Sequence, residues 1–198
     1  MSKQSILESI RQNKPDFQRE TGKPEQKPVP VSKSQTTALK SFISALEATG
    51  GEVVECSAAE ADSLISEKFP GILDFTRPEI REKYGEETPL SEFDKIETAL
   101  LNGAFGVAEN GAVWIEDRDM PRRIIPFIAQ HLVLKTEASQ IVGTMQEAYR
   151  RINLSGTGYG VFIAGPSKTA DIEQSLVYGA HGAVRLTVVI PKMPDFEA

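Results

Sequence analysis

Two apolar runs near the C-terminus, at 159–164 and 184–190, limit the folds that this chain can adopt. Between them lie a turn at 165–169, a segment with helical character at 171–178, and Gly179, which is typical of a helix end. A crossover of about 20 residues joins parallel strands rather than the two strands of a hairpin. The pattern therefore predicts a βαβ unit and, for the whole chain, an α/β fold with a Rossmann-like, mainly parallel sheet flanked by helices.

Apolar periodicity and turn residues place further elements along the chain. Helices are predicted near 39–46, 58–69 and 137–152, strands at 53–54, 71–75 and 130–134, and a short helix with a surface loop at 76–92. Two β-prone runs, 104–108 and 112–116, flank Glu109-Asn110-Gly111. Asn-Gly between such runs is a strong hairpin signal, because both residues tolerate positive φ.

The first thirty residues differ from the rest. Apolar residues at helical spacing between positions 6 and 10 predict a short amphipathic helix, and a proline-rich stretch behind them predicts an extended linker. We therefore divide the chain into a short helix with a Pro-rich linker at 1–31 and a single α/β domain at 32–198. The helix either packs on the body or on a neighbouring subunit, or is a frayed tail.

Charge and cysteine content exclude several classes of function. The net charge of −6, from 28 acidic and 22 basic residues, argues against an extended nucleic-acid footprint. Cys56 is the single cysteine, so the chain has no internal disulfide and cannot supply the four thiolates of an iron–sulfur cluster. With only two histidines, we expect no metal site. No apolar run reaches about 18 residues and the N-terminus lacks a signal-peptide core, which predicts a cytoplasmic protein without a membrane span.

The turn at 165–169 is the strongest candidate site. It follows a predicted strand and precedes a predicted helix, and ligands of open α/β sheets bind outside the carboxyl ends of the strands. A helix N-terminus there offers free N–H groups and a positive dipole end to a carboxylate or phosphate. The expected roles are anion donors at Gly165, Ser167 and Thr169, a counter-charge at Lys168, and a helix cap or acid/base group at Asp171. The alternative is that these polar residues only cap the helix.

His181 and the hairpin tip are secondary candidates. His181 lies at the amino end of the last predicted strand, where its imidazole is a candidate general base or a structural group. At the hairpin tip, Glu109 is a candidate catalytic carboxylate and Asn110 and Gly111 are candidate ligand-binding residues; a solvated turn is the alternative.

Three other chemically distinctive residues are expected to play no catalytic role. His131 lies in an apolar strand and is interpreted as structural. Trp114 alternates with apolar residues, which indicates packing, and Cys56 has no partner residue in the sequence that would activate its thiol.

The run Gly165-Pro166-Ser167-Lys168-Thr169-Ala170-Asp171-Ile172-Glu173-Gln174, followed by Gly179-Ala180-His181-Gly182, resembles the signature of the LutC/YkgG family, the lactate-utilisation (LUD) domain family. Ala108–Ala112, Ser139–Val142 and the short helix before a linker resemble it too, so the resemblance covers essentially the whole chain. It implies a fold like that of the ribose-5-phosphate isomerase, glucosamine-phosphate isomerase and CoA-transferase group (NagB/RpiA/CoA-transferase-like).

The resemblance also implies a function. Relatives of this family belong to a three-part system that oxidises L-lactate to pyruvate, so the chain is expected to be its non-redox subunit or an accessory protein. No cofactor is expected on this chain; iron–sulfur clusters are expected in two cysteine-rich partner proteins. The resemblance leaves room for a small organic anion as ligand and for a homo-oligomer.

Two departures from the family pattern bear on the candidate site. Asn110 and Ala112 stand where relatives usually have Thr and Thr or Ser, and Ala183 stands where they usually have Pro. The alternative function is a stand-alone enzyme or binding protein for a small anionic metabolite (a hydroxy acid, a sugar phosphate or a CoA ester) that uses the turn at 165–173. A purely structural scaffold is a third hypothesis, and whether the chain catalyses a reaction of its own stays open.

Overall fold

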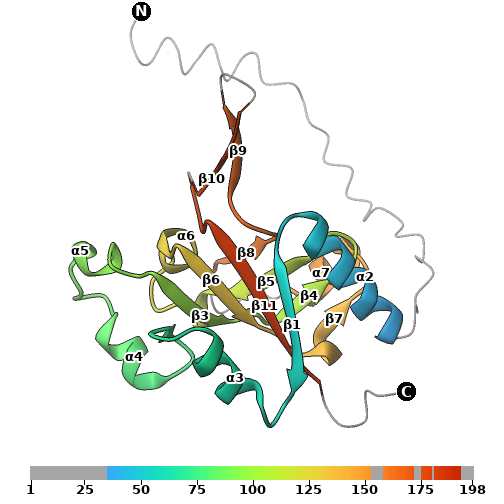
Figure 1. The fold of residues 1–198 in the computed structure, drawn as a ribbon, viewed down its shortest axis with the longest axis horizontal. Helices are drawn as coiled ribbons and strands as arrows, with labels where there is room; N and C mark the ends of the chain where they lie inside the picture. The colour runs from blue at the N-terminus through green and yellow to red at the C-terminus, as the bar shows by residue number, and fades with distance from the viewer. Residues whose placement is uncertain (1–34, 153–157, 172–174, 180, 193–198) are drawn as a thin grey trace, which may run out of the picture. The chain divides into compact units, whose positions relative to one another are not determined.

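The computed structural model describes residues 35–152, 158–171, 175–179 and 181–192. Its centre is a sheet of five parallel strands in the order β1 (Glu52–Ser57), β11 (Arg185–Lys192), β6 (His131–Lys135), β3 (Thr98–Asn102) and β2 (Leu73–Asp74) (Figure 1). This confirms the predicted α/β fold with a mainly parallel sheet. The predicted helix and linker at 1–31 lie outside the described residues.

The three central strands are apolar on both faces. Their buried residues include Ala99–Leu101, Leu132–Leu134 and Val188–Ile190. Such near-continuous runs are typical of parallel strands that are covered on both sides.

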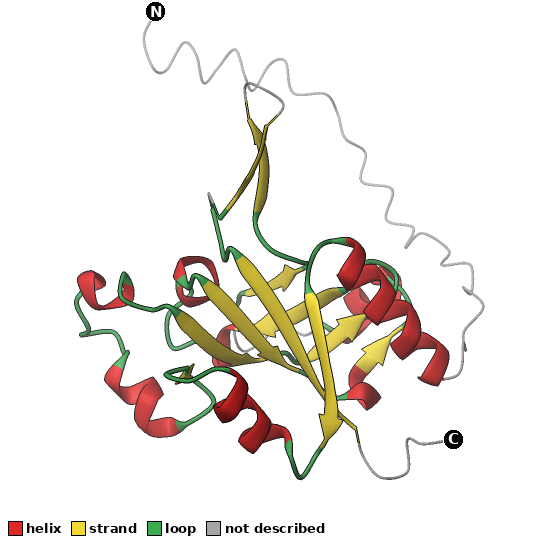
Figure 2. Ribbon diagram, in the orientation of Figure 1, coloured by secondary structure: helices red, strands yellow, loops and turns green. Residues whose placement is uncertain are grey.

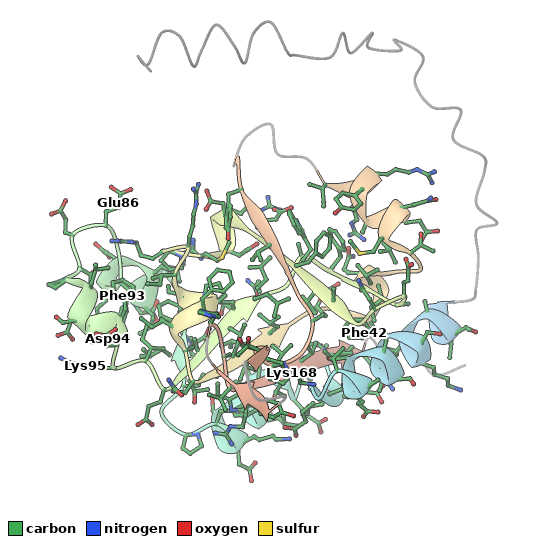
Figure 3. All side chains as sticks on the ribbon, turned by 90° about the horizontal axis from the view of Figure 1, so that it is seen from above. Phe42, Glu86, Phe93, Asp94, Lys95 and Lys168 are labelled. Carbon is green, nitrogen blue, oxygen red and sulfur yellow. The ribbon has the colours of Figure 1, made fainter. Side chains whose placement is uncertain are left out.

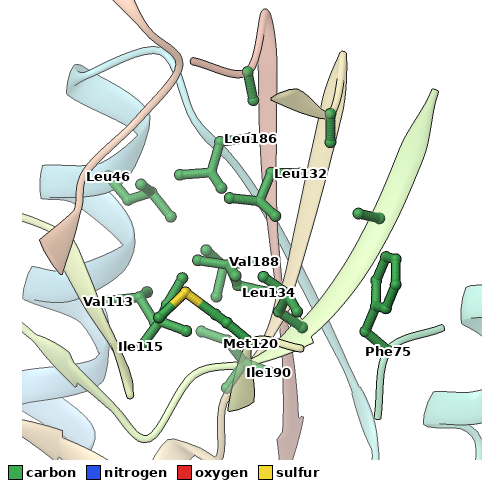
Figure 4. Close-up of a cluster of buried hydrophobic side chains, with 14 of the residues drawn as sticks. Leu46, Phe75, Val113, Ile115, Met120, Leu132, Leu134, Leu186, Val188 and Ile190 are labelled. Atoms are coloured by element: carbon green, nitrogen blue, oxygen red, sulfur yellow. The ribbon is translucent and has the colours of Figure 1, made fainter. Parts of the chain in front are cut away.

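A second sheet covers one face of the parallel sheet. Its strands are β7 (Ile141–Val142), β4 (Phe105–Val107), β5 (Ala112–Glu116) and β8 (Gly160–Ile163), in that order, and α2 (Gln35–Ala48) lies beside it (Figure 1). Leu46 of α2 and Val113 and Ile115 of β5 pack against the side chains of the parallel sheet in one buried core (Figure 4). Each large side chain buried there stabilises the fold by about 1.5–3 kcal/mol.

Helix α3 (Ala61–Lys68) covers the opposite face of the parallel sheet. Ile65 and Phe69 pack there on Leu100, Val133 and Val189. The connections hold α4 (Pro78–Lys83), α5 (Leu90–Phe93), α6 (Ile125–Ile128) and α7 (Met145–Arg151), with 3₁₀ turns at Asp117–Asp119 and Ala138–Gln140. None of the described helices is long and apolar enough to cross a membrane.

The predicted βαβ unit is wrong. β8 pairs antiparallel with β5 in the second sheet, so it is not a neighbour of β11. The predicted helix at 171–178 is replaced by a hairpin of β9 (Lys168–Asp171) and β10 (Ser175–Tyr178), which projects away from the two larger sheets (Figure 2). The physical reason is the strand preference of Leu176-Val177-Tyr178, which prevails over weak helical periodicity.

The predicted helix at 137–152 is correct only over its second half. Residues before it form a 3₁₀ turn and β7, and α7 begins at Met145. Thr144 is its N-cap: the Thr144 hydroxyl accepts from the Glu147 N–H, and the Glu147 carboxylate accepts from the Thr144 N–H in return. This capping box fixes the start of the helix.

Other predicted elements are confirmed. β4 and β5 form the expected antiparallel hairpin, and α2, β1, α3, β2 and β6 lie where the sequence places a helix or a strand. The expected packing role of Trp114 is confirmed as well: it is 5% exposed, and its ring lies 4.6 Å from that of Phe162. β3, in the middle of the parallel sheet, was not predicted.

Candidate functional site

The C-terminal end of α2 is closed by a tight glycine turn. Gly50 has φ +86°, and its N–H donates to the Glu47 carbonyl at 2.8 Å. The Thr49 hydroxyl and the Gly51 N–H both donate to the Leu46 carbonyl, at 2.6 and 3.1 Å. These bonds satisfy carbonyl groups that a helix end leaves free, as the Gly50-Gly51 pair leads one to expect.

The segment that follows β8 packs on this helix end. Gly165 has φ +77°, and a Cβ at this position would lie 2.4 Å from the Thr49 hydroxyl oxygen. The Lys168 ammonium group donates to the Thr49 carbonyl, and Figure 3 shows Lys168 beside the end of α2. A cation is favourable at this position, because the C-terminal end of a helix carries partial negative charge.

The segment that leads into β11 lies against the same residues. The Ser167 N–H donates to the Ala183 carbonyl at 2.8 Å, and the Gly179 N–H donates to the Ser167 carbonyl at 3.0 Å. A Cβ at Gly182 would lie 3.1 Å from the Ser167 Cβ. The two parts of the C-terminal signature are therefore in direct contact.

The tip of the β4–β5 hairpin meets α2 one turn earlier. Gly111 has φ +68°, and a Cβ there would lie 2.4 Å from the backbone nitrogen of Leu46. The Asn110 side-chain oxygen accepts from the Ala112 N–H at 3.1 Å, which holds the turn. The hairpin tip thus fits the α2 backbone closely only because Gly111 has no side chain.

Three segments that are far apart in the sequence therefore converge on the end of α2. We name this assembly the motif cluster; it consists of Thr49, Gly50, Gly111, Gly165, Ser167, Lys168, Gly182 and Ala183. It lies at the amino edge of the parallel sheet, since α2 leads into the start of β1 and Ala183 precedes β11. The expectation that the turn at 165–169 faces the crevice at the carboxyl ends of that sheet is wrong, because β8 belongs to the second sheet.

The predicted helix N-terminus for an anion is also wrong. The Asp171 backbone lies in β9 and caps no helix there, and Thr169 lies in the same strand. The helix end that the segment does meet is a C-terminus, which attracts the Lys168 cation rather than an anion. The helix predicted at 171–178 therefore gives no support to an anion site here. Ligand binding by Gly165, Ser167, Lys168 and Thr169 stays a prediction, as does an acid/base role of Asp171.

The secondary candidates have separate positions. The Glu109 carboxylate accepts from the Met145 N–H at 2.7 Å, so it stabilises the start of α7. His181 is exposed and lies at the amino edge of the sheet, as expected. It directly precedes Gly182 of the motif cluster in the sequence. These residues do not share one described pocket. A catalytic role of Glu109, ligand binding by Asn110 and Gly111, and a role of His181 as a base stay predictions.

A hydrogen-bonded group of the buried His131 and Thr187 with the exposed Glu52 lies at the same edge, on the α3 face. The His131 Nε2 is 2.8 Å from the Thr187 hydroxyl oxygen, and that hydroxyl donates to the Glu52 carboxylate at 3.2 Å. Burial lowers the pKa of His131 below its usual value; the Arg185 charge lowers it further and Glu52 opposes this. Phe69 packs edge-on against the imidazole, which supports the structural role that the sequence indicates.

No metal centre emerges from the part of the chain that the structure describes. Among these residues, no group of three His, Cys, Asp or Glu side chains is arranged to hold a metal ion. Cys56 is half-buried, and burial, together with the Glu60 charge, raises the pKa of its thiol. A raised pKa disfavours the reactive thiolate.

The sequence of this chain is similar to those of known proteins. The family model of the LUD domain matches residues 75–190, more than half of the chain. A Lactate utilization protein C from Deinococcus radiodurans is 32% identical over 110 residues, covering 53% of this chain and 52% of that protein. A Lactate utilization protein C from Anoxybacillus flavithermus is 35% identical over 85 residues, covering 42% and 39%.

A solved structure shares the fold. A DUF162 family protein from Deinococcus radiodurans superposes with a TM-score of 0.63 at 20% identity, covering 81% of this chain and 99% of that chain. The chain spans about half the length, or less, of the curated relatives it matches. The matched range 75–190 contains every part of the motif cluster except the end of α2.

Proposed function

Because this chain belongs to the LUD domain family, we propose that it is a non-redox subunit of a system that oxidises L-lactate to pyruvate. The system would pass two electrons and two protons from each lactate to other components. Iron–sulfur clusters in two cysteine-rich partner proteins would accept the electrons. The observation that carries the proposal is the similarity to proteins named Lactate utilization protein C, from several species.

The composition of the chain supports a division of labour between subunits. A four-thiolate cluster needs cysteines that this chain lacks, since Cys56 is alone and half-buried. The described contacts of the motif cluster are internal: backbone hydrogen bonds, close glycine approaches and the Lys168 cap of α2. We expect the cluster to hold a surface for a partner rather than to carry out chemistry. The motif cluster lies at one edge of the sheet, and the exposed His181 next to it is available for contact with a partner.

The test is anaerobic reconstitution on a sizing column. The chain is mixed with the two cysteine-rich candidate partners, and lactate-dependent dye reduction is read across the eluted peak. We expect co-elution and a higher rate in the shared peak. His181→Ala tests contact at the motif cluster, and Leu90→Ser, which changes an exposed residue of α5 on the other side of the fold, is its control (Figure 1).

A different outcome would contradict the proposal. If the chain elutes alone and leaves the rate unchanged, the proposal fails. The alternative is then a stand-alone protein for a small anionic metabolite. A thermal-shift screen of hydroxy acids, sugar phosphates and CoA esters would test it, because a ligand at 100 times its Kd adds about 2.7 kcal/mol to stability.

A further inference from the structure

A cleft of about 260 Å³ opens on the α3 face of the parallel sheet, and residues of α3 and α4 line it. Figure 1 shows these two helices as neighbours below the sheet. Its floor is apolar and consists of Ile65, Phe69, Ile72, Ile80 and Leu100. Its mouth is polar and consists of Asp62, Ser66, Asp74 and Arg77. The cleft shares no residue with the motif cluster, so the inference below does not rest on the proposed function.

Arg77 is fixed at the mouth with most of its donors unused. The Asp74 carboxylate accepts three hydrogen bonds: from the Thr76 N–H at 3.0 Å, from the Thr76 hydroxyl at 2.6 Å and from the Arg77 Nε at 2.8 Å. Asp74 is therefore held by its own loop, and its Oδ2 orients the Arg77 guanidinium group through Nε. Among the residues that the structure describes, no acceptor is bonded to the two Nη groups of Arg77, which carry four of its five N–H donors.

Asp62 provides the opposite charge. Its Oδ1 accepts from the Lys135 ammonium at 2.8 Å, which lowers the pKa of Asp62 and keeps the carboxylate ionised. Its side chain is 80% exposed, and its Oδ2 has no hydrogen bond within the described ranges. The formal charges of Asp62, Asp74, Arg77 and Lys135 sum to zero.

We propose that this cleft binds an α-amino acid with a branched or aromatic apolar side chain. The amino acid carboxylate bonds to the Nη groups of Arg77, its ammonium group bonds to the free oxygen of Asp62, and its side chain covers the apolar floor. A zwitterion carries no net charge, so it uses the free donors of Arg77 and the free oxygen of Asp62 without changing the neutrality of the mouth. An acid of the same shape would add negative charge beside Asp74, and an amine would leave the donors of Arg77 unpaired.

The size of the cleft agrees with this class of ligand. Its volume is about 260 Å³. Clefts for larger ligands and cofactors run from about 300 to 1,000 Å³. The cleft therefore has room for a single amino acid.

Three probes with the same hydrocarbon body separate the possibilities. L-Leucine, 4-methyl-2-oxopentanoate and isopentylamine are titrated into the full chain by calorimetry. We expect L-leucine to bind and each of the other two to bind at least about tenfold more weakly, since each lacks one of the two charges. The proposal is overturned if L-leucine shows no binding, or if the oxo acid or the amine binds as tightly.

Two variants and one control locate the binding. Arg77→Gln removes the guanidinium donors, and Ser66→Trp fills the mouth from an exposed position of α3. Both should weaken L-leucine binding at least about tenfold. Arg118→Gln, which changes an exposed arginine paired with Glu116 outside the cleft, should leave it unchanged. Unaltered L-leucine binding in either cleft variant, with an unchanged urea midpoint as proof of folding, would show that the site lies elsewhere.

Discussion

Gly111→Ala is the substitution with the most sharply defined cost in this fold. A Cβ at Gly111 would lie 2.4 Å from the Leu46 nitrogen, 2.6 Å from the Leu46 Cα and 2.9 Å from the Ala45 carbonyl carbon. These are backbone atoms in the last turn of α2, so they cannot move aside as the end of a flexible side chain can. Either the hairpin tip must leave α2 or the helix must shift.

The magnitude has two parts. The positive φ of +68° costs an alanine about 1–2 kcal/mol, because its Cβ approaches the following carbonyl oxygen. Overpacking against α2 adds about 1–3 kcal/mol. The total of about 2–5 kcal/mol is a large fraction of the 5–15 kcal/mol by which domains are typically stable.

Two other glycines serve as matched controls. Gly158 and Gly71 have φ of +67° and +79°, and a Cβ at either would meet no atom of the described residues within 4 Å. Alanine at these positions therefore carries only the conformational cost of about 1–2 kcal/mol. Urea unfolding, followed by the fluorescence of Trp114, measures all three. Equal losses of stability at the three positions would refute the close contact between the hairpin tip and α2.

Three further predictions concern polar groups. The pKa of His131 in the folded chain lies below its value in the unfolded chain, which is about 6.5. The contribution of neutral His131 to stability is therefore full above pH 6.5 and is lost as the pH falls toward the folded-state pKa. In a pH series of urea midpoints, His131→Gln should flatten the decrease below pH 6.5. Glu109→Ala removes the acceptor of the Met145 N–H and should cost about 1 kcal/mol in urea unfolding, whereas an unchanged midpoint would show that α7 does not depend on it. Lys168→Met should cost about 0.5 kcal/mol at low salt and less at high salt, and a loss independent of salt would argue against a charge effect at the end of α2.

Some elements of the fold were predictable because their signals are local. The apolar spacing of α2, the Gly50-Gly51 stop and the Asn110-Gly111 turn each involve neighbouring residues and a single conformational preference. β6 was predictable from its short apolar run, Leu132–Leu134. In all of these, local propensity and tertiary packing favour the same structure.

Other elements could not be predicted because their sequences are compatible with more than one structure. β3 reads Thr-Ala-Leu-Leu-Asn, and burial on both faces removes the alternation that identifies a strand. The segment at 168–178 has an apolar spacing compatible with a helix, yet it forms the β9–β10 hairpin. The pairing of β8 with β5 could not be predicted from the sequence either, because a turn and a long connection after β8 are compatible with a place in either sheet.

The candidate site shows the same division. The sequence identifies the segments around Asn110, Ser167 and His181, but their convergence on the end of α2 depends on contacts between residues far apart in the chain. The close approaches at Gly111 and Gly165 carry no local signal beyond the glycines themselves. The mouth of the cleft escaped sequence analysis for the same reason: Asp62, Asp74 and Arg77 look like ordinary surface charges until α3 and α4 are placed side by side.

We propose that this chain assists lactate oxidation without holding the redox centres. The most direct measurement is the initial rate of lactate-dependent dye reduction by the two cysteine-rich candidate partners, with and without the chain, under anaerobic conditions. We expect no dye reduction by the chain alone, a lower rate with the partners alone, and a rate that rises with added chain to a stoichiometric plateau. A rate that is unchanged by the chain, or dye reduction by the chain alone, would contradict it.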